Sequence, residues 1–348
     1  VEMGDQSGKH YLERWELLNA YSGCMIGNPA IPVIADAYVK GIQNFNVPKA
    51  YQYALNTAEK FGNGDKGYTY QSFGISNTLE YAFAESCLAD LSKALSKMDD
   101  EKIYRKRAQS YRNIFDTATG WFRPKLKDGE WEPMPAEGRL KEWYGTIECN
   151  PYQQGWFVPH DVKGMVELMG GNKKVIDDLT NLFDKTPENM MWNNYYNHAN
   201  EPVHHVPFLF NRVGAPWLTQ KWTRAICKRA YHNSVEGLVG NEDVGQMSAW
   251  YVLAASGFHP IAAGNLRYEI TSPVFNKVII QLDKQYASGK TFIIIAKNNS
   301  PENIYIQSAT LNGKVYPYCF ISHTDIVSGG VLELQMGSEP NKEWGRSE

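Results

Sequence analysis

The chain has 348 residues, 21% of them charged, and a formal net charge of −3. This length suffices for one large domain or two ordinary ones, and the lack of a basic run argues against a nucleic-acid partner. No apolar run reaches the roughly 18 residues that a membrane-spanning helix needs. Five widely spaced cysteines without a CxxC motif indicate neither a disulfide framework nor a zinc knuckle.

Helical spacing of apolar residues recurs between about residues 29 and 257. Glycine, proline and asparagine separate the periodic segments. Either Ser76 or Asn77 is expected to cap the third helix. Paired helices with their loops on one side suggest an (α/α) toroid that is either complete or incomplete at its N-terminus. The expected helices cover residues 31–42, 47–61, 77–95, 100–115, 161–171, 172–183, 215–231 and 246–256.

After about residue 265 the pattern changes to short apolar or alternating runs bounded by Gly, Asn and Asp. The tetrapeptide LNGK within the third run is a hairpin signal. We therefore predict a mainly α protein with a toroidal catalytic domain over residues 1–264, followed by a small antiparallel β unit over 265–348 that packs on it. The expected strands cover residues 277–283, 291–298, 303–314 and 330–336.

Aromatic residues make up 13% of the chain and gather in three long loops between the expected helices. Trp and Tyr stack on flat or ring-shaped ligands and also offer a polar edge, which suits sugars. The alternative is that a large helical core uses aromatic side chains as filler. Long loops inside a compact domain are usually functional, so these loops are the first place to look for a site.

Glu148 lies in one of these loops, within YGTIECNPYQQGWF. Aromatic surroundings desolvate a carboxyl group, which favours its protonated form. We expect Tyr144, Trp156 and Tyr196 to wall a pocket near this carboxyl group. The alternative for Glu148 is a loop acid that is hydrogen-bonded to Asn150 or to a tyrosine.

Asp243 lies on a glycine-flanked turn, GNEDVGQ, just before an expected helix. Such polar surroundings favour the ionised form. One protonated and one ionised carboxyl group are what acid–base hydrolysis of a glycosidic bond requires. Capping of the following helix is the alternative role for Asp243. An EF-hand loop does not fit, because no glutamate stands at the twelfth position counted from Asn241.

Three histidines occur in HANEPVHH, residues 198–205. Their spacing matches neither HExxH nor a zinc finger, and the proline interrupts the helix that HExxH needs. Asn200 and Glu201 offer oxygen donors, which suit calcium or sugar hydroxyl groups better than zinc.

Several long stretches together resemble glycoside hydrolase family 92, in the order in which that family has them. They are MIGNPAIPVIADAYVKGI, SNTLEYAF, WFRPKLKDGEW, ECNPYQQGWFVPHDVKGM, HANEPVHHVPFLFN and GNEDVGQMSAWY. The family comprises calcium-dependent, inverting exo-α-mannosidases with an N-terminal β-sandwich and a C-terminal (α/α)6 domain. This chain resembles only the C-terminal part. The resemblance implies α-mannoside glycans as substrates, the missing N-terminal domain as an intramolecular partner, and a secreted, periplasmic or cell-surface location.

The resemblance also implies roles for individual residues. Glu148 stands at the position of the general acid, although Cys149 replaces a glycine of the family motif. Relatives that act on mannosyl phosphates carry glutamine there, so a glutamate implies an ordinary sugar leaving group. Asp243 stands at the position of the general base, and Asn241 stands where some members carry a second acid. The Asn–Glu pair at 200–201 replaces the His–Glu of α-1,2-specific members, which leaves the linkage preference open.

The expected function is that of a calcium-dependent inverting exo-α-mannosidase that releases mannose from α-mannosides such as the mannose chains of N-glycans. With inversion, the carboxyl groups of the acid and the base should lie roughly 6.5–9.5 Å apart. The alternative is a non-catalytic carbohydrate-binding or structural fragment, inactive without the N-terminal domain. Expected substrate contacts are Asn200, Glu201, His198, Trp156 and Gln153. Expected neighbours of the calcium ion are Asn200, Glu201 and Asp243.

Overall fold

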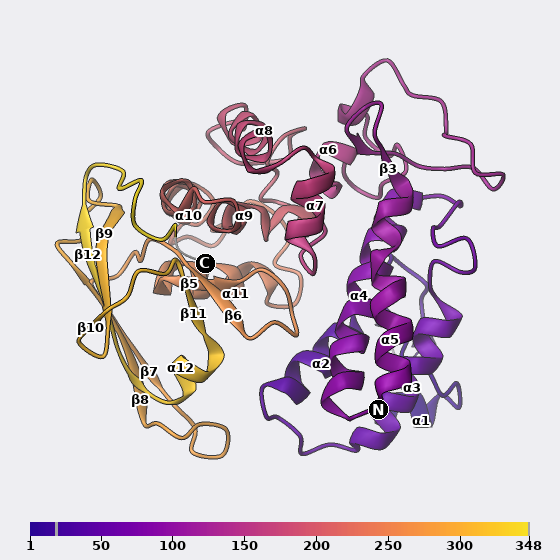
Figure 1. The fold of residues 1–348 in the computed structure, drawn as a ribbon, viewed down its shortest axis with the longest axis horizontal. Coiled ribbons are helices and arrows are strands. Elements are labelled where there is room, and N and C mark those ends of the chain that lie inside the picture. Colours follow the sequence, from indigo (N-terminus) through magenta and orange to yellow (C-terminus); the bar gives the residue numbers. More distant parts are fainter. Residues whose placement is uncertain (18–19, 347–348) are drawn as a thin grey trace. The chain divides into compact units, whose positions relative to one another are not determined.

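The computed structural model describes residues 1–17 and 20–346. They form two compact units (Figure 1). The first unit comprises Val1–Asp161 with Ala262–Gly264, and the second comprises Val162–Ile261 with Asn265–Glu348. Glu148 belongs to the first unit and Asp243 to the second, so each unit carries one of the two predicted catalytic carboxylates.

The first unit is built around the long helix α4 (Gly74–Ala94), most of whose residues are buried. Helices α2 (Ala30–Val39), α3 (Val47–Lys60) and α5 (Met98–Arg107) pack against it (Figure 1). Their apolar faces form one core, which includes Ile31, Tyr51 and Leu88. The remaining elements are short: α1 (Glu2–Gln6), β1 (Glu16–Leu17), β2 (Ala20–Tyr21), the 3-10 helix η1 (Ala108–Ile114), β3 (Phe115–Asp116), β4 (Trp121–Phe122), η2 (Gly138–Leu140) and α6 (Pro151–Gln154).

The second unit combines helices with two sheets. The larger sheet has the strand order β10-β9-β12-β8-β7, and the smaller has the order β11-β6-β5. Its helices are α7 (Val162–Leu168), α8 (Asn172–Asp184), η3 (Glu201–Val203), η4 (Val206–Phe208), α9 (Leu209–Arg212), α10 (Pro216–Arg229), α11 (Gln246–Ser256) and α12 (His323–Val327). Its strands are β5 (Phe258–Pro260), β6 (Arg267–Ile270), β7 (Lys277–Gln281), β8 (Thr291–Lys297), β9 (Tyr305–Leu311), β10 (Lys314–Val315), β11 (Phe320–Ser322) and β12 (Gly330–Gly337).

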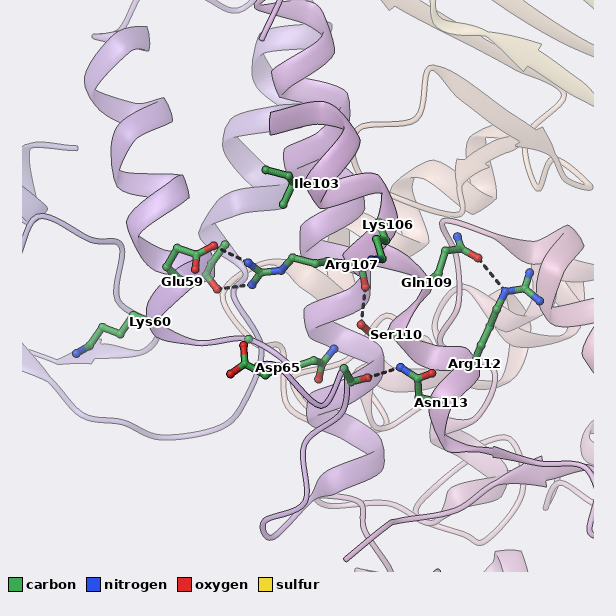
Figure 2. A pocket seen from close by; sticks show the side chains of 15 residues that line it. Glu59, Lys60, Asp65, Ile103, Lys106, Arg107, Gln109, Ser110, Arg112 and Asn113 are labelled. Atoms are coloured by element: carbon green, nitrogen blue, oxygen red, sulfur yellow. Dashed lines mark hydrogen bonds and ion pairs between the residues drawn. The ribbon is translucent and has the colours of Figure 1, made fainter. Parts of the chain in front are cut away.

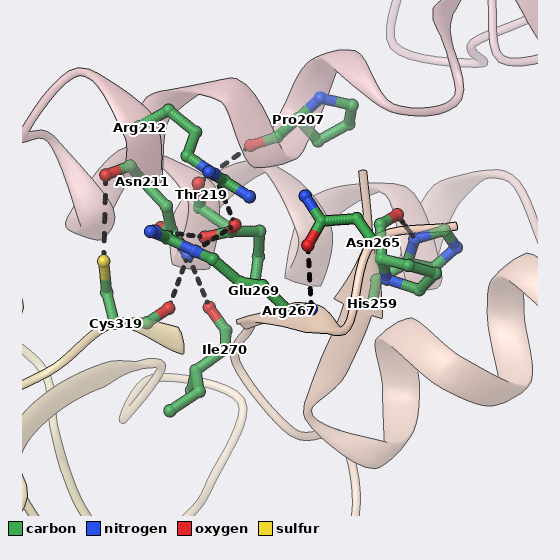
Figure 3. Close-up of polar contacts among 11 residues, drawn as sticks. Pro207, Asn211, Arg212, Thr219, His259, Asn265, Arg267, Glu269, Ile270 and Cys319 are labelled. Carbon is green, nitrogen blue, oxygen red and sulfur yellow. Dashed lines mark hydrogen bonds and ion pairs between the residues drawn. The ribbon is translucent and has the colours of Figure 1, made fainter. Parts of the chain in front are cut away.

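A buried charge cluster fixes α9 to the smaller sheet of the second unit (Figure 3). The carboxylate of Glu269 is fully buried and accepts hydrogen bonds from Arg212, at 2.6 Å, and from Arg267, at 2.9 Å. The Asn211 amide donates to the carbonyl groups of Ile270 and Cys319, at 3.1 and 2.9 Å. A buried carboxylate is tolerated only when it is paired in this way. These bonds therefore hold α9 and the strands of the smaller sheet together.

All eight expected helices and all four expected strands are present, and the hairpin is confirmed. Asn312 and Gly313 both have positive φ, 51° and 77°, as a two-residue hairpin turn between β9 and β10 requires. The prediction of an antiparallel sheet is wrong in one place. Strand β12 enters the sheet between β9 and β8 and pairs in parallel with β8. Short strands β5, β6 and β11 went unpredicted, and the toroid and the domain boundary after residue 264 stay predictions.

No helix among the described residues is long and apolar enough to cross a membrane.

Candidate active site

Glu148 lies on a tight turn, residues 143–150, which we call the Glu148 turn. Three of its residues have left-handed backbone: Trp143 (φ 65°), Gly145 (φ 70°) and Glu148 (φ 55°). Cys149 closes the turn, because its carbonyl group accepts hydrogen bonds from the Trp143 amide, at 3.0 Å, and from the Thr146 hydroxyl, at 2.7 Å. Left-handed non-glycine residues are uncommon and often mark functional sites.

The Glu148 turn caps the N-terminus of α4. The Gly145 carbonyl accepts from the amides of Ile75 and Ser76, at 2.8 and 3.2 Å. The expected cap by Ser76 or Asn77 is therefore wrong: Phe73 is the N-cap residue, with no side-chain cap bond. The Gly145 carbonyl group, from a loop distant in sequence, caps the helix instead. The Ser76 hydroxyl group does not cap the helix and accepts a hydrogen bond from the Ile147 amide, at 3.2 Å.

The carboxyl group of Glu148 belongs to an exposed residue, whereas its aromatic neighbours are buried. Trp156 is fully buried and packs edge-on against Trp121, with ring centroids 5.0 Å apart. Tyr152 is also buried against Trp121. These rings are thus part of the core of the first unit, and their role in walling a pocket around Glu148, with Tyr144 and Tyr196, stays a prediction.

Gln153, a predicted substrate contact, is buried at the end of the same turn. Its side chain accepts from the Asn150 amide, at 3.2 Å, and its own amide donates to the Asn150 side chain, at 3.0 Å. This capping box starts the short helix α6. The roles of Gln153 and Trp156 as substrate contacts stay predictions.

Asp243 lies on a second turn, residues 240–245, which we call the Asp243 turn. Asp243 (φ 49°), Val244 (φ 56°) and Gly245 (φ 99°) are three consecutive residues with positive φ. Asp243 and Val244 are exposed. A left-handed conformation is a true outlier for a β-branched residue such as Val244. The structure therefore holds Asp243 at the surface on a strained backbone.

Glu242, and not Asp243, caps helix α11. Its carboxylate accepts hydrogen bonds from the backbone amides of Gly245 and Ser248, the latter at 3.0 Å. Hydrogen bonds from Ser248 and Gly245 lower the pKa of this carboxyl group. Glu242 and Asp243 are adjacent, and either could cap α11 as far as the sequence shows. Only the backbone conformation determines which of them does. Asp243 is thereby left for another role.

A buried polar network lies next to the Asp243 turn in the second unit. His198 is fully buried, and its two ring nitrogens bond to the hydroxyl groups of Tyr196 and Tyr231, both at 2.8 Å. His204 bonds to the His198 carbonyl, at 3.0 Å, and to the side chain of Gln246, at 3.2 Å. Burial lowers the pKa of His204 to about 4. Since both nitrogens of His198 are engaged, its predicted substrate contact stays a prediction.

The segment with Asn200 and Glu201 packs against the Asp243 turn. A Cβ atom on Gly240 would lie 2.4 Å from the carbonyl oxygen of Ala199, so only glycine allows this approach. Asn200 is buried, and the side-chain oxygen of Asn197 is buried without a hydrogen-bond partner among the described residues. Ala199, directly before Asn200, thus contacts the Asp243 turn, and the neighbours of the calcium ion stay predictions.

Charged and sulfur-bearing side chains do not gather into a metal site in the part of the chain that the structure describes. Over residues 1–17 and 20–346, no group of three or more His, Cys, Asp or Glu side chains has the geometry to hold a metal ion. Asparagine and backbone oxygens fall outside such a group, and these are the ligands that calcium accepts.

Two of the pockets among the described residues lie in the first unit. The larger, of about 890 Å³, lies between residues 58–67 and 103–113 (Figure 2). None of the predicted site residues lines it. Its polar groups largely bond to one another, as Arg107 does to Glu59 and Asn113 does to Gly67. The smaller, of about 140 Å³, adjoins the Glu148 turn, because Tyr144 and Pro151 line it together with Trp121 and Arg139.

Comparison with known proteins identifies the family. The glycosyl hydrolase family 92 catalytic domain matches residues 1–338. The chain belongs to glycosyl hydrolase family 92. Among solved structures, the family 92 α-mannosidase BT3965 from Bacteroides thetaiotaomicron is 33% identical, with a TM-score of 0.91 over 99% of this chain and 46% of that one. The inverting mannosidase BT2199 from the same organism is 29% identical, with a TM-score of 0.89 over 99% of this chain and 50% of that one.

A curated relative gives the same result. An uncharacterized secreted glycosidase from Arthroderma benhamiae is 31% identical over 92% of this chain and 46% of its own length. The chain thus spans about half the length of these family 92 relatives. It carries a glycosyl hydrolase catalytic domain of the α-mannosidase family.

Proposed function

We propose that this family 92 domain is the catalytic part of an inverting exo-α-mannosidase, with Glu148 as general acid and Asp243 as general base. The observation that carries the proposal is the shared geometry of the two turns. Each presents an exposed acidic residue at positive φ, 55° for Glu148 and 49° for Asp243. In each turn, a neighbouring residue accepts the hydrogen bonds at the start of a helix: Gly145 for α4 and Glu242 for α11. Neither Glu148 nor Asp243 is therefore needed to cap a helix.

Hydrolysis then proceeds in one displacement. The Glu148 carboxyl group donates its proton to the glycosidic oxygen as the bond from that oxygen to the anomeric carbon breaks. The Asp243 carboxylate takes a proton from a water molecule, whose oxygen bonds to the anomeric carbon from the opposite face. Inversion requires space for this water, so the two carboxyl groups should lie roughly 6.5–9.5 Å apart in the assembled enzyme. A crystal structure with a mannose-like inhibitor measures this separation.

We also propose a calcium ion beside the Asp243 turn, held by residues of the segment 197–201. The buried, unpartnered oxygen of Asn197 fits a hard cation, as do the oxygens of Asn200 and Glu201. Asp243 is a further candidate, directly or through water. When bound, the ion would polarise vicinal mannose hydroxyl groups and help to distort the sugar ring. Activity that survives EDTA, or that zinc alone restores, would contradict this assignment.

The substrates we propose are α-mannosides, such as the mannose chains of N-glycans. Support comes from relatives, since BT3965 is called an α-mannosidase and has been solved in complex with mannoimidazole. The secreted curated relative supports action outside the cell or in the periplasm. The part of those relatives that this chain does not span is the proposed partner, an N-terminal domain that completes the pocket.

One pair of variants tests the catalytic assignment. Glu148→Gln should lower kcat for an α-mannobiose by about 10²–10⁴-fold, yet spare 2,4-dinitrophenyl α-mannoside, whose leaving group needs little protonation. Asp243→Asn should impair both substrates. Proton NMR should show β-mannose as the first product. If the wild-type protein binds mannosides but turns over neither substrate, the domain is a carbohydrate-binding or structural part instead.

A further inference from the structure

We infer that Ser76 is a positioning residue for Glu148, although the two lie 72 positions apart in the sequence. The inference rests on the proposed role of Glu148 as general acid. Ser76 is fully buried near the start of α4. Its hydroxyl group accepts from the Ile147 amide, at 3.2 Å, and donates to the side-chain oxygen of Gln154, at 2.9 Å.

These bonds reach the chain on both sides of Glu148. Ile147, directly before it, is held by Ser76. Cys149, directly after it, donates its thiol hydrogen to the same Gln154 oxygen, at 3.6 Å. Burial raises the pKa of the Cys149 thiol, which keeps it a donor. The Gln154 oxygen therefore collects bonds from Ser76 and Cys149, and Glu148 projects from a peptide segment fixed at both ends.

Other buried hydroxyl groups of α4 donate differently, although Thr78 also accepts from the Thr69 amide and Ser92 also bonds to the Tyr51 hydroxyl group. Thr78 donates to the Gly74 carbonyl, at 2.6 Å, and Ser92 donates to the Leu88 carbonyl, at 2.7 Å. Both bonds stay within the helix and join residues four apart, a common pattern for Ser and Thr. Ser76 instead directs its hydroxyl hydrogen out of the helix to Gln154. If the Ser76 hydroxyl group only stabilised the helix, it would not need to donate to a residue outside the helix.

Positioning matters because proton transfer needs the acid within hydrogen-bond reach of the leaving oxygen. A displacement of about 1 Å can cost on the order of 10²-fold in rate. The Glu148 turn already has three left-handed residues, so its conformation depends on outside support. Ser76 supplies that support from the most buried helix of the first unit, and its loss should misplace the acid without touching the substrate.

The test compares Ser76→Ala with Ser92→Ala, which removes an equally buried hydroxyl group from the other end of the same helix. Amide hydrogen exchange by NMR should speed up at Ile147 by about tenfold or more in Ser76→Ala and stay unchanged in Ser92→Ala. In kinetics, Ser76→Ala should lower kcat on an α-mannobiose by roughly 10–100-fold and change turnover of the dinitrophenyl mannoside less than about threefold. KM should stay near the wild-type value.

The outcomes separate this inference from the proposed function. If Glu148→Gln lacks the leaving-group selectivity, the general acid is misassigned, while exchange at Ile147 still decides whether Ser76 holds the turn. Unchanged exchange at Ile147 in Ser76→Ala overturns the inference, and so does equal loss on both substrates.

Gln154→Met, which removes the acceptor from the opposite side, should reproduce the kinetic selectivity even if Ser76→Ala folds poorly. Ser76→Thr, which keeps a hydroxyl group, should recover most of the slow exchange.

Discussion

The Glu148 turn and the Asp243 turn present the same kind of residue in the same backbone conformation, yet they are supported in opposite ways. Ile75 and Ser76 of the distant helix α4 bond to the first turn, and so does Gln154 of α6, the short helix that directly follows it. The second is held by its own neighbour in sequence, because Glu242 bonds to the amides at the start of α11. Hydrogen bonds from far away in the sequence thus support the first turn. The side-chain hydrogen bonds at the second come from its own Glu242, although Ala199 also packs against its Gly240.

The difference matches what each carboxyl group is proposed to do. A general acid must meet one leaving oxygen, and a rigid long-range frame fixes where its proton is delivered. A general base acts on a water molecule, which adjusts its own position. Crowding also differs next to the two acids: Gly145 packs against Pro124 and Ile75, whereas Gly245 has open space around it and only Gly240, at the start of the second turn, is crowded. Substitutions at matched positions can test whether this contrast is energetic as well as geometric.

The largest effect on stability is expected when alanine replaces Gly145 in the Glu148 turn, compared with Gly245 in the Asp243 turn. Gly145→Ala adds a Cβ atom 2.8 Å from Pro124 on a residue with φ 70°, so clash and backbone strain combine to about 3 kcal/mol of lost stability. Gly245→Ala meets no atom within 4 Å and should cost only the strain of φ 99°, about 1–2 kcal/mol. Urea unfolding of each variant measures both. Equal costs would mean that the two turns are equally supported.

The next largest effect is a pH dependence of stability. It comes from buried histidines of the second unit, which contains the Asp243 turn. Burial lowers the pKa of His204 to about 4 and that of His259 to about 3, from 6.5. These two histidines then bind more protons in the unfolded chain than in the folded chain, so their contribution to stability is full above pH 6.5 and falls as the pH drops toward 4. His204 alone should contribute a loss approaching about 3 kcal/mol at pH 4.

His204→Gln should flatten this acid dependence, even though the variant is less stable at pH 7 because the bond to the His198 carbonyl is weakened. His232→Asn, at an exposed histidine of the same unit, serves as the control and should leave the profile unchanged. Thermal unfolding followed from pH 7.5 to 4 gives the comparison. An unaltered slope in His204→Gln would show that the acid sensitivity comes from other groups.

The sequence predicted the local features of this site and missed the long-range ones. Helix α11 was predicted with its observed bounds, Gln246–Ser256, because its apolar period and its Gly flanks are contiguous. The family motifs point to both acids, whose catalytic roles stay predictions. Nothing in the sequence pairs Ser76 with Ile147 or Gln154, because the fold alone brings residues 71 or more positions apart together. The packing of Trp156 against Trp121 was missed for the same reason, since the sequence does not fix which ring a buried aromatic side chain contacts.

A smaller effect is expected from removing the local cap of the Asp243 turn. Glu242→Ala frees the amides of Gly245 and Ser248 and should cost about 1–2 kcal/mol. Ser322→Ala removes a similar cap, at the start of α12 in the same unit, and should cost a similar amount. Only Glu242→Ala should also lower mannoside turnover, because it loosens the residue next to Asp243. Equal turnover in the two variants would show that the cap stabilises α11 without serving the base.

The smallest effect, and the one with an unusual sign, is expected at Val244. Its side chain is fully exposed, so replacing it removes no packing, and its φ of 56° is strained for a β-branched residue. Relief of left-handed strain, about 1–2 kcal/mol, should exceed the entropic cost of glycine, about 0.5–1 kcal/mol. Val244→Gly should therefore gain up to about 1 kcal/mol in stability.

Val235→Gly provides the control for that gain, since Val235 is also fully exposed but is not among the residues with positive φ. It should lose about 0.5–1 kcal/mol through the entropy of glycine alone. If the strain serves to hold Asp243 in place, Val244→Gly should trade its gain in stability for a severalfold lower kcat on both leaving groups. A stabilised variant with unchanged kcat would show instead that the strain at Val244 does not contribute to placing the base, and that Glu242 and Gly245 suffice.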